Sequence, residues 1–177
     1  HSNLRRQRQM CIRDRHRMMC YINTTLHYRQ TGFLGDTLSE CWLGLFPDAD
    51  FAGSKQDAKS TSGVFLALCG PKTFFPLAAM SKKQGCVSHS TTEAEIVSMN
   101  TALRSVGLPQ LDLWTTLIGK KPELRVYEDN QATARIVTTG KFPKLRHVSR
   151  THAVSVSWVH ERITDEEVSL VDCTTNC

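Results

Sequence analysis

The chain has 177 residues, of which 40% are apolar, and its formal net charge at pH 7 is +5. A chain of this length and composition buries one ordinary hydrophobic core, so we expect one main domain with appendages. No apolar run approaches the roughly 18 residues that a bilayer crossing needs, and the arginine-rich start lacks the apolar stretch of a secretory signal. These features argue against a membrane partner and predict an intracellular protein.

The positive charge is concentrated at the N-terminus. Residues 1–17 contain six arginines and one aspartate. Removing these from the 22 basic and 17 acidic residues of the chain leaves 16 of each, so the rest of the chain is neutral. The net charge by itself therefore does not indicate a nucleic-acid partner.

The seven cysteines are scattered, at positions 11, 20, 41, 69, 86, 173 and 177. They do not form the paired CxxC grid that builds a zinc site. Their number and spacing favour reduced thiols in an intracellular protein.

We expect the first 40 residues to be appendages of the main domain. Residues 1–17 show no usable periodicity, so we expect them to be disordered or foreign to the domain. In residues 18–28 an apolar side chain recurs every fourth position, which predicts a short amphipathic helix that ends before two glycines.

A buried strand opens the main domain. Residues 41–46 form a continuous apolar run, typical of a strand buried on both faces, and the run ends at Pro47 and Asp48. By the two-residue period of a strand, Asp48 shares a face with Trp42 and Phe46.

Two further strands follow along the chain. Residues 64–69 and 73–79 are apolar runs separated by a Gly-Pro turn signal. Pro76 implies that the third strand lies at an edge or contains a bulge.

Helical spacing begins near residue 90. Ser90 or Thr91 can act as the N-cap, and the apolar stripe consists of Ile96, Met99, Leu103 and Val106. On a wheel of about 100° per residue, Glu95 lies roughly 60° from the middle of this stripe and can face the sheet. Glu93 lies roughly 100° away, so we expect it to face water.

The next part alternates between helix and strand. Residues 108–118 predict a second helix, and residues 124–128 predict a strand that ends at Asp129. On the strand's alternation, Asp129 shares a face with Arg125 and Tyr127. Asn130 can cap a short helix.

The last part contains an ambiguity. Residues 138–147 form a basic loop, and the pattern from 152 to 163 fits either a strand or a helix. Residues 168–172 predict a final strand. Strands that precede the first long helix and then alternate with helices indicate a mixed α/β fold.

Three carboxylates could therefore converge at one edge of the predicted sheet: Asp48 on a central strand, Glu95 on the following helix and Asp129 at a neighbouring strand end. Hydrolysis of a phosphodiester by two metal ions needs carboxylates that hold hard cations about 3.5–4 Å apart. Asp48, Glu95 and Asp129 would supply such a pocket, and magnesium suits oxygen ligands. Each signal is weak alone, because an acidic residue at a strand end is more often a turn former or a helix cap.

Five motifs in order resemble the ribonuclease H domain of copia-type LTR retrotransposon Pol polyproteins. They are Asp48-Ala49-Asp50-Phe51-Ala52-Gly53, Lys59-Ser60-Thr61-Ser62-Gly63, Ser81-Lys82-Lys83-Gln84, Ser90-Thr91-Thr92-Glu93-Ala94-Glu95 and Glu128-Asp129-Asn130-Gln131-Ala132. The resemblance divides the chain into a basic tail (1–17), the end of a reverse transcriptase region (18–40) and a ribonuclease H domain (41–177).

The resemblance implies an α/β ribonuclease H-like fold, with a mixed five-stranded sheet and flanking helices. It implies an endoribonuclease that cleaves the RNA strand of RNA–DNA hybrids beside the reverse transcriptase region of the same polyprotein, in a cytoplasmic particle or the nucleus. Asp48, Glu95 and Asp129 fall on the family's metal-ligand positions, for two Mg²⁺ ions or Mn²⁺ in their place.

Some features depart from the family or extend the site. The family carries a fourth aspartate in a helix after the last strand, and this sequence lacks that helix. His152 matches a basic segment of the family and is a candidate auxiliary residue for proton transfer or product release. Candidate contacts to nucleic-acid phosphates are Lys82, Lys83, Lys144, Arg146 and Arg150.

Two rival interpretations stay open. The chain could be a catalytically dead remnant that acts only as a folded nucleic-acid-binding or structural module. It could also be another nuclease of the same fold, such as an integrase. The position of Glu95 between Asp48 and Asp129 favours the ribonuclease, because integrases place their glutamate last.

Overall fold

The computed structural model describes residues 2–54, 56–142, 145 and 147–173. The chain divides into two compact units, His1–Thr31 and Gly32–Cys177. Within the described part, no helix combines the length and the apolar character that a membrane crossing requires.

The first unit contains one helix, α1 (Ser2–Thr25). This differs from the expectation that residues 1–17 lack regular structure and that a helix starts near residue 18. The segment has no proline or glycine before residue 32 and is rich in Arg, Gln and Met, which favour helix. Met18 and Ile22 are exposed on this helix, and Leu26 is exposed directly after it.

The second unit is built on a five-stranded sheet in the order β3-β2-β1-β4-β5. Its strands are β1 (Trp42–Asp50), β2 (Thr61–Gly70), β3 (Thr73–Lys83), β4 (Leu124–Glu128) and β5 (Val168–Asp172). The pairs β1–β2 and β2–β3 are antiparallel, whereas β1–β4 and β4–β5 are parallel. The predicted mixed sheet is therefore confirmed.

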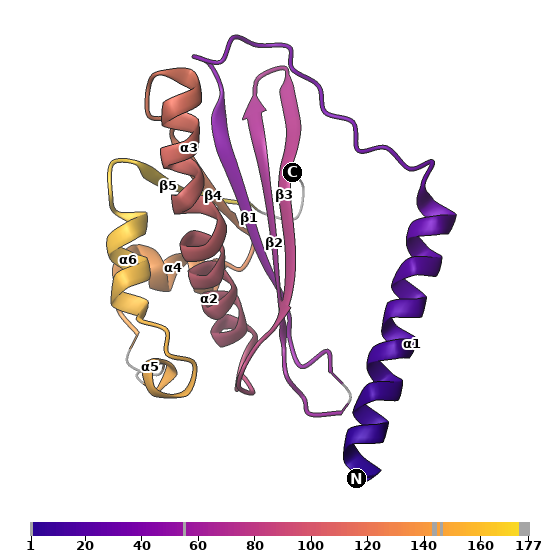
Figure 1. Cartoon of the computed structure of the whole chain (residues 1–177). Helices are drawn as coiled ribbons and strands as arrows, with labels where there is room; N and C mark the ends of the chain where they lie inside the picture. Colours follow the sequence, from indigo (N-terminus) through magenta and orange to yellow (C-terminus); the bar gives the residue numbers. More distant parts are fainter. Residues whose placement is uncertain (1, 55, 143–144, 146, 174–177) are drawn as a thin grey trace. The chain divides into compact units, whose positions relative to one another are not determined.

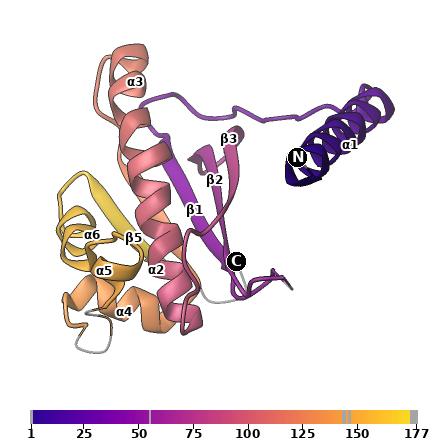
Figure 2. The ribbon, with the colours of Figure 1, turned by 60° about the horizontal axis from the view of Figure 1, so that its bottom comes forward.

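Helices gather on one side of this sheet. They are α2 (Thr91–Ala102), the π-helical segment η1 (Leu103–Gly107), α3 (Leu108–Ile118), α4 (Gln131–Thr139), α5 (Val148–Thr151) and α6 (Val156–Ile163). Helix α2 contacts β1 and β2, and α4 and α6 pack beside it (Figure 1). The turned view shows α2, η1 and α3 as one long helical path across the sheet (Figure 2).

The core lies between the sheet and this helical path. Ile96, Met99 and Leu103 of the predicted stripe are fully buried. Gly107 allows the close approach, because a Cβ there would meet Leu45 Cδ2 at 2.9 Å and Leu124 Cδ2 at 3.0 Å. The sequence pattern thus identified the face of α2 that packs on the sheet.

Two details of the pattern are resolved by the structure. The ambiguous segment forms helix α6, and its cap Ser155 accepts a hydrogen bond from the N–H of Trp158 (3.2 Å). Strand β3 is an edge strand, and its register against β2 shifts next to Pro76. Both readings of Pro76, an edge or a bulge, therefore hold.

The other face of the sheet carries aromatic side chains. Trp42 Nε1 donates to the hydroxyl of Tyr127 (3.0 Å), and the ring of Phe46 stacks on Tyr127 with centroids 4.6 Å apart. The guanidinium of Arg125 lies 3.9 Å from the centroid of the Trp42 ring. These contacts agree with the strand faces expected from the two-residue alternation.

Candidate active site

The sheet topology brings the ends of β1 and β4 to one edge. These strands are parallel neighbours, and Leu45 pairs with Val126. Continuing this register by three residues brings Asp48, near the end of β1, level with Asp129, which directly follows β4. Both carboxylates are exposed.

Glu95 reaches the same edge from helix α2. Its side chain is only 5% exposed, and its Oε2 atom accepts no hydrogen bond from the described residues. Burial, then the charges of Asp48 and Asp129, raise the pKa of Glu95 to about 8, against a smaller opposing hydrogen bond from the N–H of Ala49. Asp48 and Asp129 therefore both lie within electrostatic range of Glu95 at this end of the sheet.

A fourth carboxylate, Glu128, lies beside them and was missed by sequence reasoning. It is the last residue of β4 and is fully buried. The pKa of Glu128 is raised to about 8. Burial is the largest cause, the charge of Glu95 is the next, and Asp129 and Asp48 have smaller effects in the same direction. The alternation of β4 was the available signal, because it places Glu128 on the inward face with Leu124 and Val126.

The buried carboxyl of Glu128 is only half satisfied. Its Oε1 accepts a hydrogen bond from the N–H of Asn130 (3.2 Å), whereas its Oε2 has no partner among the described residues. Asn130 also caps α4, since its side chain accepts from the N–H of Thr133 (3.0 Å). The start of α4 is thus fixed beside the carboxylates.

A serine holds α2 against the strands next to this edge. The Ser98 hydroxyl lies 2.7 Å from the carbonyl oxygen of Asp48 and 3.1 Å from that of Gly63. Asp48 and Gly63 are direct partners in the β1–β2 ladder. The position of Glu95 relative to Asp48 is therefore set by contacts between regular elements.

Glu93 is not exposed to water as the helical wheel predicted. It is 1% exposed, and its Oε2 accepts from the N–H of His89 (3.0 Å) and lies 3.2 Å from His147 Nε2. Burial would raise the pKa of Glu93, but these contacts and the charges of His147 and His152 together lower it. The helical-wheel prediction took account only of packing against the sheet. In the structure, the chain around α5 covers the other side of α2.

His152 lies with Glu93 and not among the four carboxylates. Its side chain is 2% exposed, and its Nε2 is 3.1 Å from Glu93 Oε1 without the alignment of a hydrogen bond. His152 therefore contacts α2, the helix that carries Glu95, and is shielded from solvent.

The predicted phosphate-contacting residues are spread over two elements. Lys82 and Lys83 end β3, and Arg150 lies on α5. Lys83 Nζ forms an ion pair with Asp57 (2.8 Å). The predicted residues Lys144 and Arg146 lie outside the described residues.

The carboxylates fit a hard cation in their chemistry. Buried oxygens on Glu95 and Glu128 lack partners among the described residues, and Mg²⁺ prefers oxygen ligands and is often held by only one or two carboxylates. In the described part of the chain, no group of three or more His, Cys, Asp or Glu side chains already forms a metal-binding cluster. Any cation here would thus bind to few protein ligands or draw them closer together.

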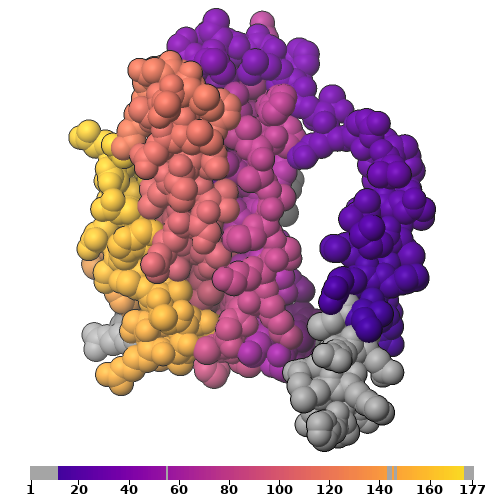
Figure 3. Space-filling model, in the orientation of Figure 1, coloured from indigo at the N-terminus to yellow at the C-terminus, as the bar shows by residue number. Residues whose placement is uncertain are grey.

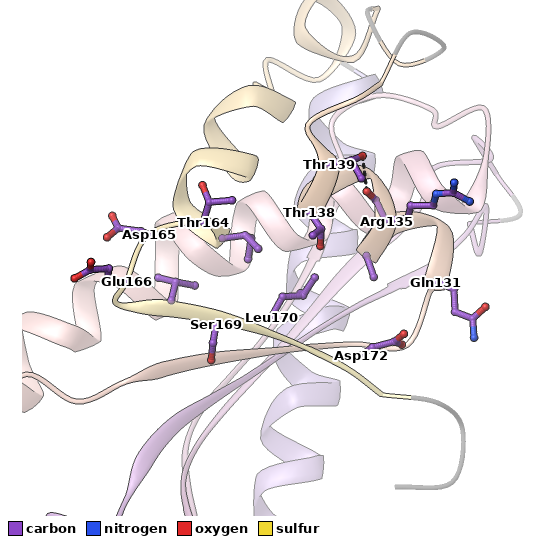
Figure 4. A pocket seen from close by; sticks show the side chains of 13 residues that line it. Gln131, Arg135, Thr138, Thr139, Thr164, Asp165, Glu166, Ser169, Leu170 and Asp172 are labelled. Atoms are coloured by element: carbon purple, nitrogen blue, oxygen red, sulfur yellow. Dashed lines mark hydrogen bonds between the residues drawn. The ribbon is translucent and has the colours of Figure 1, made fainter.

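One cavity of the described part of the chain lies away from these carboxylates. It has a volume of about 670 Å³ and lies between α4, the turn after α6 and β5. Thr138, Thr164, Asp165 and Asp172 are among the side chains around it, and none of the four carboxylates lines it (Figure 4). We place the candidate site at the carboxylate edge because the perturbed acidic groups are there.

Comparison with solved structures defines the class of fold. The chain is similar to ribonuclease H1 of the halophilic archaeon Halobacterium salinarum NRC-1, with a TM-score of 0.51 and 12% identity over 75% of this chain and 86% of that chain. It is also similar to LC11 ribonuclease H1 in complex with an RNA/DNA hybrid, with a TM-score of 0.49 and 16% identity over 75% and 86% of the two chains. The chain has a ribonuclease H-like fold.

Comparison of sequences finds a relative among transposon polyproteins. No family model matches the chain. It is 29% identical over 151 residues to the retrovirus-related Pol polyprotein from transposon TNT 1-94 of Nicotiana tabacum, which covers 82% of this chain and 11% of the polyprotein. The predicted resemblance to the ribonuclease H domain of a retrotransposon Pol polyprotein is confirmed, and the chain spans about a tenth of that relative's length.

Proposed function

We propose that this chain is an endoribonuclease domain that cleaves the RNA strand of RNA–DNA hybrids through two Mg²⁺ ions, for which Mn²⁺ can substitute. The observation that carries the proposal is the convergence of Asp48, Glu95 and Asp129 at one edge of a ribonuclease H-like sheet. The similarity to a retrotransposon Pol polyprotein supports the substrate, since reverse transcription produces such hybrids.

Asp48, Glu95 and Asp129 would hold the cations, with Glu128 beside Glu95. When bound, divalent cations lower the pKa of water and stabilise charge on the phosphate oxygens. The chain's own part is placement, because Ala49 N–H contacts Glu95 and Ser98 fixes α2 to β1. The partial burial of the site strengthens the attraction between carboxylate and cation.

The proposal also concerns the rest of the chain. Residues 41–177 form the ribonuclease domain, residues 18–40 end a reverse transcriptase region, and residues 1–17 are a tail foreign to both. The domain acts inside the cell beside the reverse transcriptase of the same polyprotein. The basic residues Lys82, Lys83 and Arg150 contact hybrid phosphates.

A cleavage assay on the full chain tests the activity. A hybrid labelled on each strand in turn is incubated with and without Mg²⁺, and only the RNA strand should be cut. Asp48→Asn should reduce the rate by more than roughly 100-fold, because losing even an indirect support of a metal ligand costs up to this much. Asp112→Asn, a change of the same kind on α3, is the control and should cleave at the wild-type rate.

The same assay separates the rival interpretation. If the wild-type chain binds the hybrid but no divalent cation elicits cleavage, the chain is a catalytically dead nucleic-acid-binding module. If both DNA and RNA strands are cut equally, the substrate assignment is wrong.

A further inference from the structure

Strand β5 forms one edge of the sheet, and its outer side has no neighbour among the described strands. The space-filling view shows the residues of α6 and β5, in yellow, at the surface along one side of the second unit (Figure 3). The carbonyl of Glu167 and the N–H of Cys173 bond to β4. Because successive residues of a strand turn their backbone groups to opposite sides, those of Leu170 and Asp172 face outward.

These outward backbone groups are free to pair with another strand. Among the described residues, none bonds to the backbone of Leu170 or Asp172 on the outer side. At the other edge of the sheet the chain itself pairs with β3, because Phe33 and Phe74 exchange two backbone hydrogen bonds. An edge strand with free N–H and C=O groups can accept an extended segment of another chain.

The cavity of about 670 Å³ adjoins this edge. Its apolar lining consists of Ala134, Ile163, Val168 and Leu170. Leu170 is half-buried and projects from β5 toward α4 (Figure 4). Directly opposed residues of two paired strands share a face of the sheet, so a residue paired with Leu170 would project its side chain into the cavity. An apolar side chain suits this position.

Unpaired acidic side chains lie at the two ends of β5. Glu166 in the turn before the strand and Asp172 at its end are exposed and form no ion pair with the described residues. Asp165 is already paired with Arg162 (3.2 Å). Arg135 also lines the cavity, but its side chain points away from β5 (Figure 4). Two basic side chains of a partner could therefore pair with Glu166 and Asp172.

The same charges disfavour two other occupants. If β5 paired antiparallel with β5 of a second copy, centred on Leu170, each Asp172 would lie opposite Val168 of the other copy and next to the side of its Glu166. Like charges would then face each other at both ends of the pair. A polynucleotide backbone would also meet acidic side chains here.

We propose that the outer edge of β5 and the adjoining cavity, together the β5 groove, bind an extended segment of a partner protein. The segment adds a strand beside β5, inserts an apolar side chain next to Leu170 and carries a Lys or Arg two positions away on each side. Residues two apart in a strand share a face, so these basic side chains approach Glu166 and Asp172. This interaction is independent of the proposed nuclease activity.

Binding of labelled peptides to the full chain tests the proposal. Fluorescence anisotropy compares the peptide Thr-Lys-Thr-Leu-Thr-Lys-Thr with its isomer Thr-Thr-Lys-Leu-Lys-Thr-Thr, whose lysines lie on the opposite face of the strand from its leucine. The first peptide should bind, and the isomer should bind more weakly because its lysines point away from Glu166 and Asp172. Equal affinities, or no saturable binding of the first peptide up to about 1 mM, would overturn the proposal.

A third peptide tests the backbone pairing. It carries N-methyl groups on the leucine and on both adjacent threonines of the first peptide, so it keeps the side chains and the charge but loses the backbone donors. Its binding should be lost, because main-chain hydrogen bonds supply the affinity in strand addition. Binding as tight as that of the first peptide would show that no strand is added to β5.

Charge reversal in the protein tests the acidic ends of the groove. Glu166→Lys/Asp172→Lys should bind the first peptide roughly tenfold more weakly, because attraction at both ends becomes repulsion. Asp57→Lys/Asp112→Lys is the matched control. It reverses two exposed acids outside the cavity, and Asp57 pairs with Lys83 of β3 at the opposite edge of the sheet. Equal losses in the two double variants would show a general charge effect and contradict the proposal.

Hydrogen exchange locates the contact. The amide of Leu170 should exchange more slowly when the first peptide is bound, since its N–H then donates to the peptide. Protection elsewhere with Leu170 unchanged would reject the β5 groove as the site. A dimer of the chain alone that the first peptide dissociates would mean that a second copy occupies the edge, contrary to the proposal. The peptide series uses the unchanged protein, so it decides the question even if a charge-reversed variant does not fold.

Discussion

Helix α2 carries two buried glutamates in two contrasting environments. Glu93 lies within 3.2 Å of two histidine nitrogens and accepts a backbone hydrogen bond, and its pKa is lowered. Glu95, two residues on, faces Glu128, Asp48 and Asp129, and its pKa is raised to about 8. The same side chain is ionised in one environment and resists ionisation in the other.

The difference shows which buried carboxylates receive their partners from the protein itself. The fold supplies Glu93 with two histidine nitrogens and a backbone N–H, so that carboxylate serves to join α2 to the chain around α5. Among the described residues no Lys, Arg or His forms an ion pair with Glu95 or Glu128, so their charge is balanced only when a proton or a cation comes from solution. A purely structural site does not need buried carboxylates that lack such partners.

The largest expected effect on stability comes from replacing Glu93. Glu93→Ala should lower the free energy of unfolding by roughly 3 kcal/mol, because it removes one partner of a buried pair and leaves His152 enclosed. Urea unfolding measures this. His147→Ala should cost less, since that histidine is 41% exposed. A loss for Glu93→Ala as small as that of a surface change would show that the histidine contacts contribute little.

The pH dependence of stability should be opposite on the two sides. Glu95 and Glu128 have folded pKa values near 8 against an ordinary 4.5, so the folded state holds the extra protons and these residues favour folding most at low pH. Without divalent cation, this contribution is lost as pH rises from about 4.5 to about 8. The pKa of Glu93 is lowered, so its contribution is present above pH 4.5 and is lost as pH falls below it.

The double variant Glu95→Gln/Glu128→Gln tests the pH dependence expected from Glu95 and Glu128. Its urea midpoint should change less than that of wild type between pH 5 and pH 8, since neither amide titrates. Glu166→Gln, an exposed glutamate in the turn before β5, serves as the control and should follow wild type. A wild-type midpoint that does not fall over this range would mean that the two buried carboxyls ionise freely.

The smallest effect expected is the stabilisation by magnesium. At pH 8 and a concentration of about 100 times the Kd, Mg²⁺ should raise the free energy of unfolding by up to roughly 2.7 kcal/mol. Glu95→Gln should remove most of this gain, whereas Glu93→Gln should retain it. Thermal unfolding with and without Mg²⁺ measures the difference. Equal gains in both variants would place the cation elsewhere.

Much of the fold could be predicted from local pattern. Apolar runs predicted the first three strands and local pattern predicted the two later ones, and the stripe through Ile96, Met99 and Leu103 gave the buried face of α2. The motif resemblance and the strand ends identified Asp48, Glu95 and Asp129, whose charges the structure brings together. These features depend on one element and its immediate neighbours.

What could not be predicted depends on segments distant in sequence. Glu93 was assigned to water because the chain that carries His147 and His152, more than 50 residues further on, does not enter a helical wheel. Glu128 was overlooked because an acidic residue on the inward face of a strand is costly, and its neighbour Asp129 matched the motif.

The π-helical turn between α2 and α3 has a consequence for how the domain can vary. Its wider hydrogen-bonding pattern advances the backbone by an extra residue, so α2 and α3 form one rod whose two halves differ in rotational phase. Gly107 lies in that turn against Leu45 and Leu124, where even an alanine methyl would collide. A deletion of one residue here would restore a uniform helix and turn either the α3 half or the Glu95 half away from the sheet, so this short stretch should tolerate neither length changes nor larger side chains.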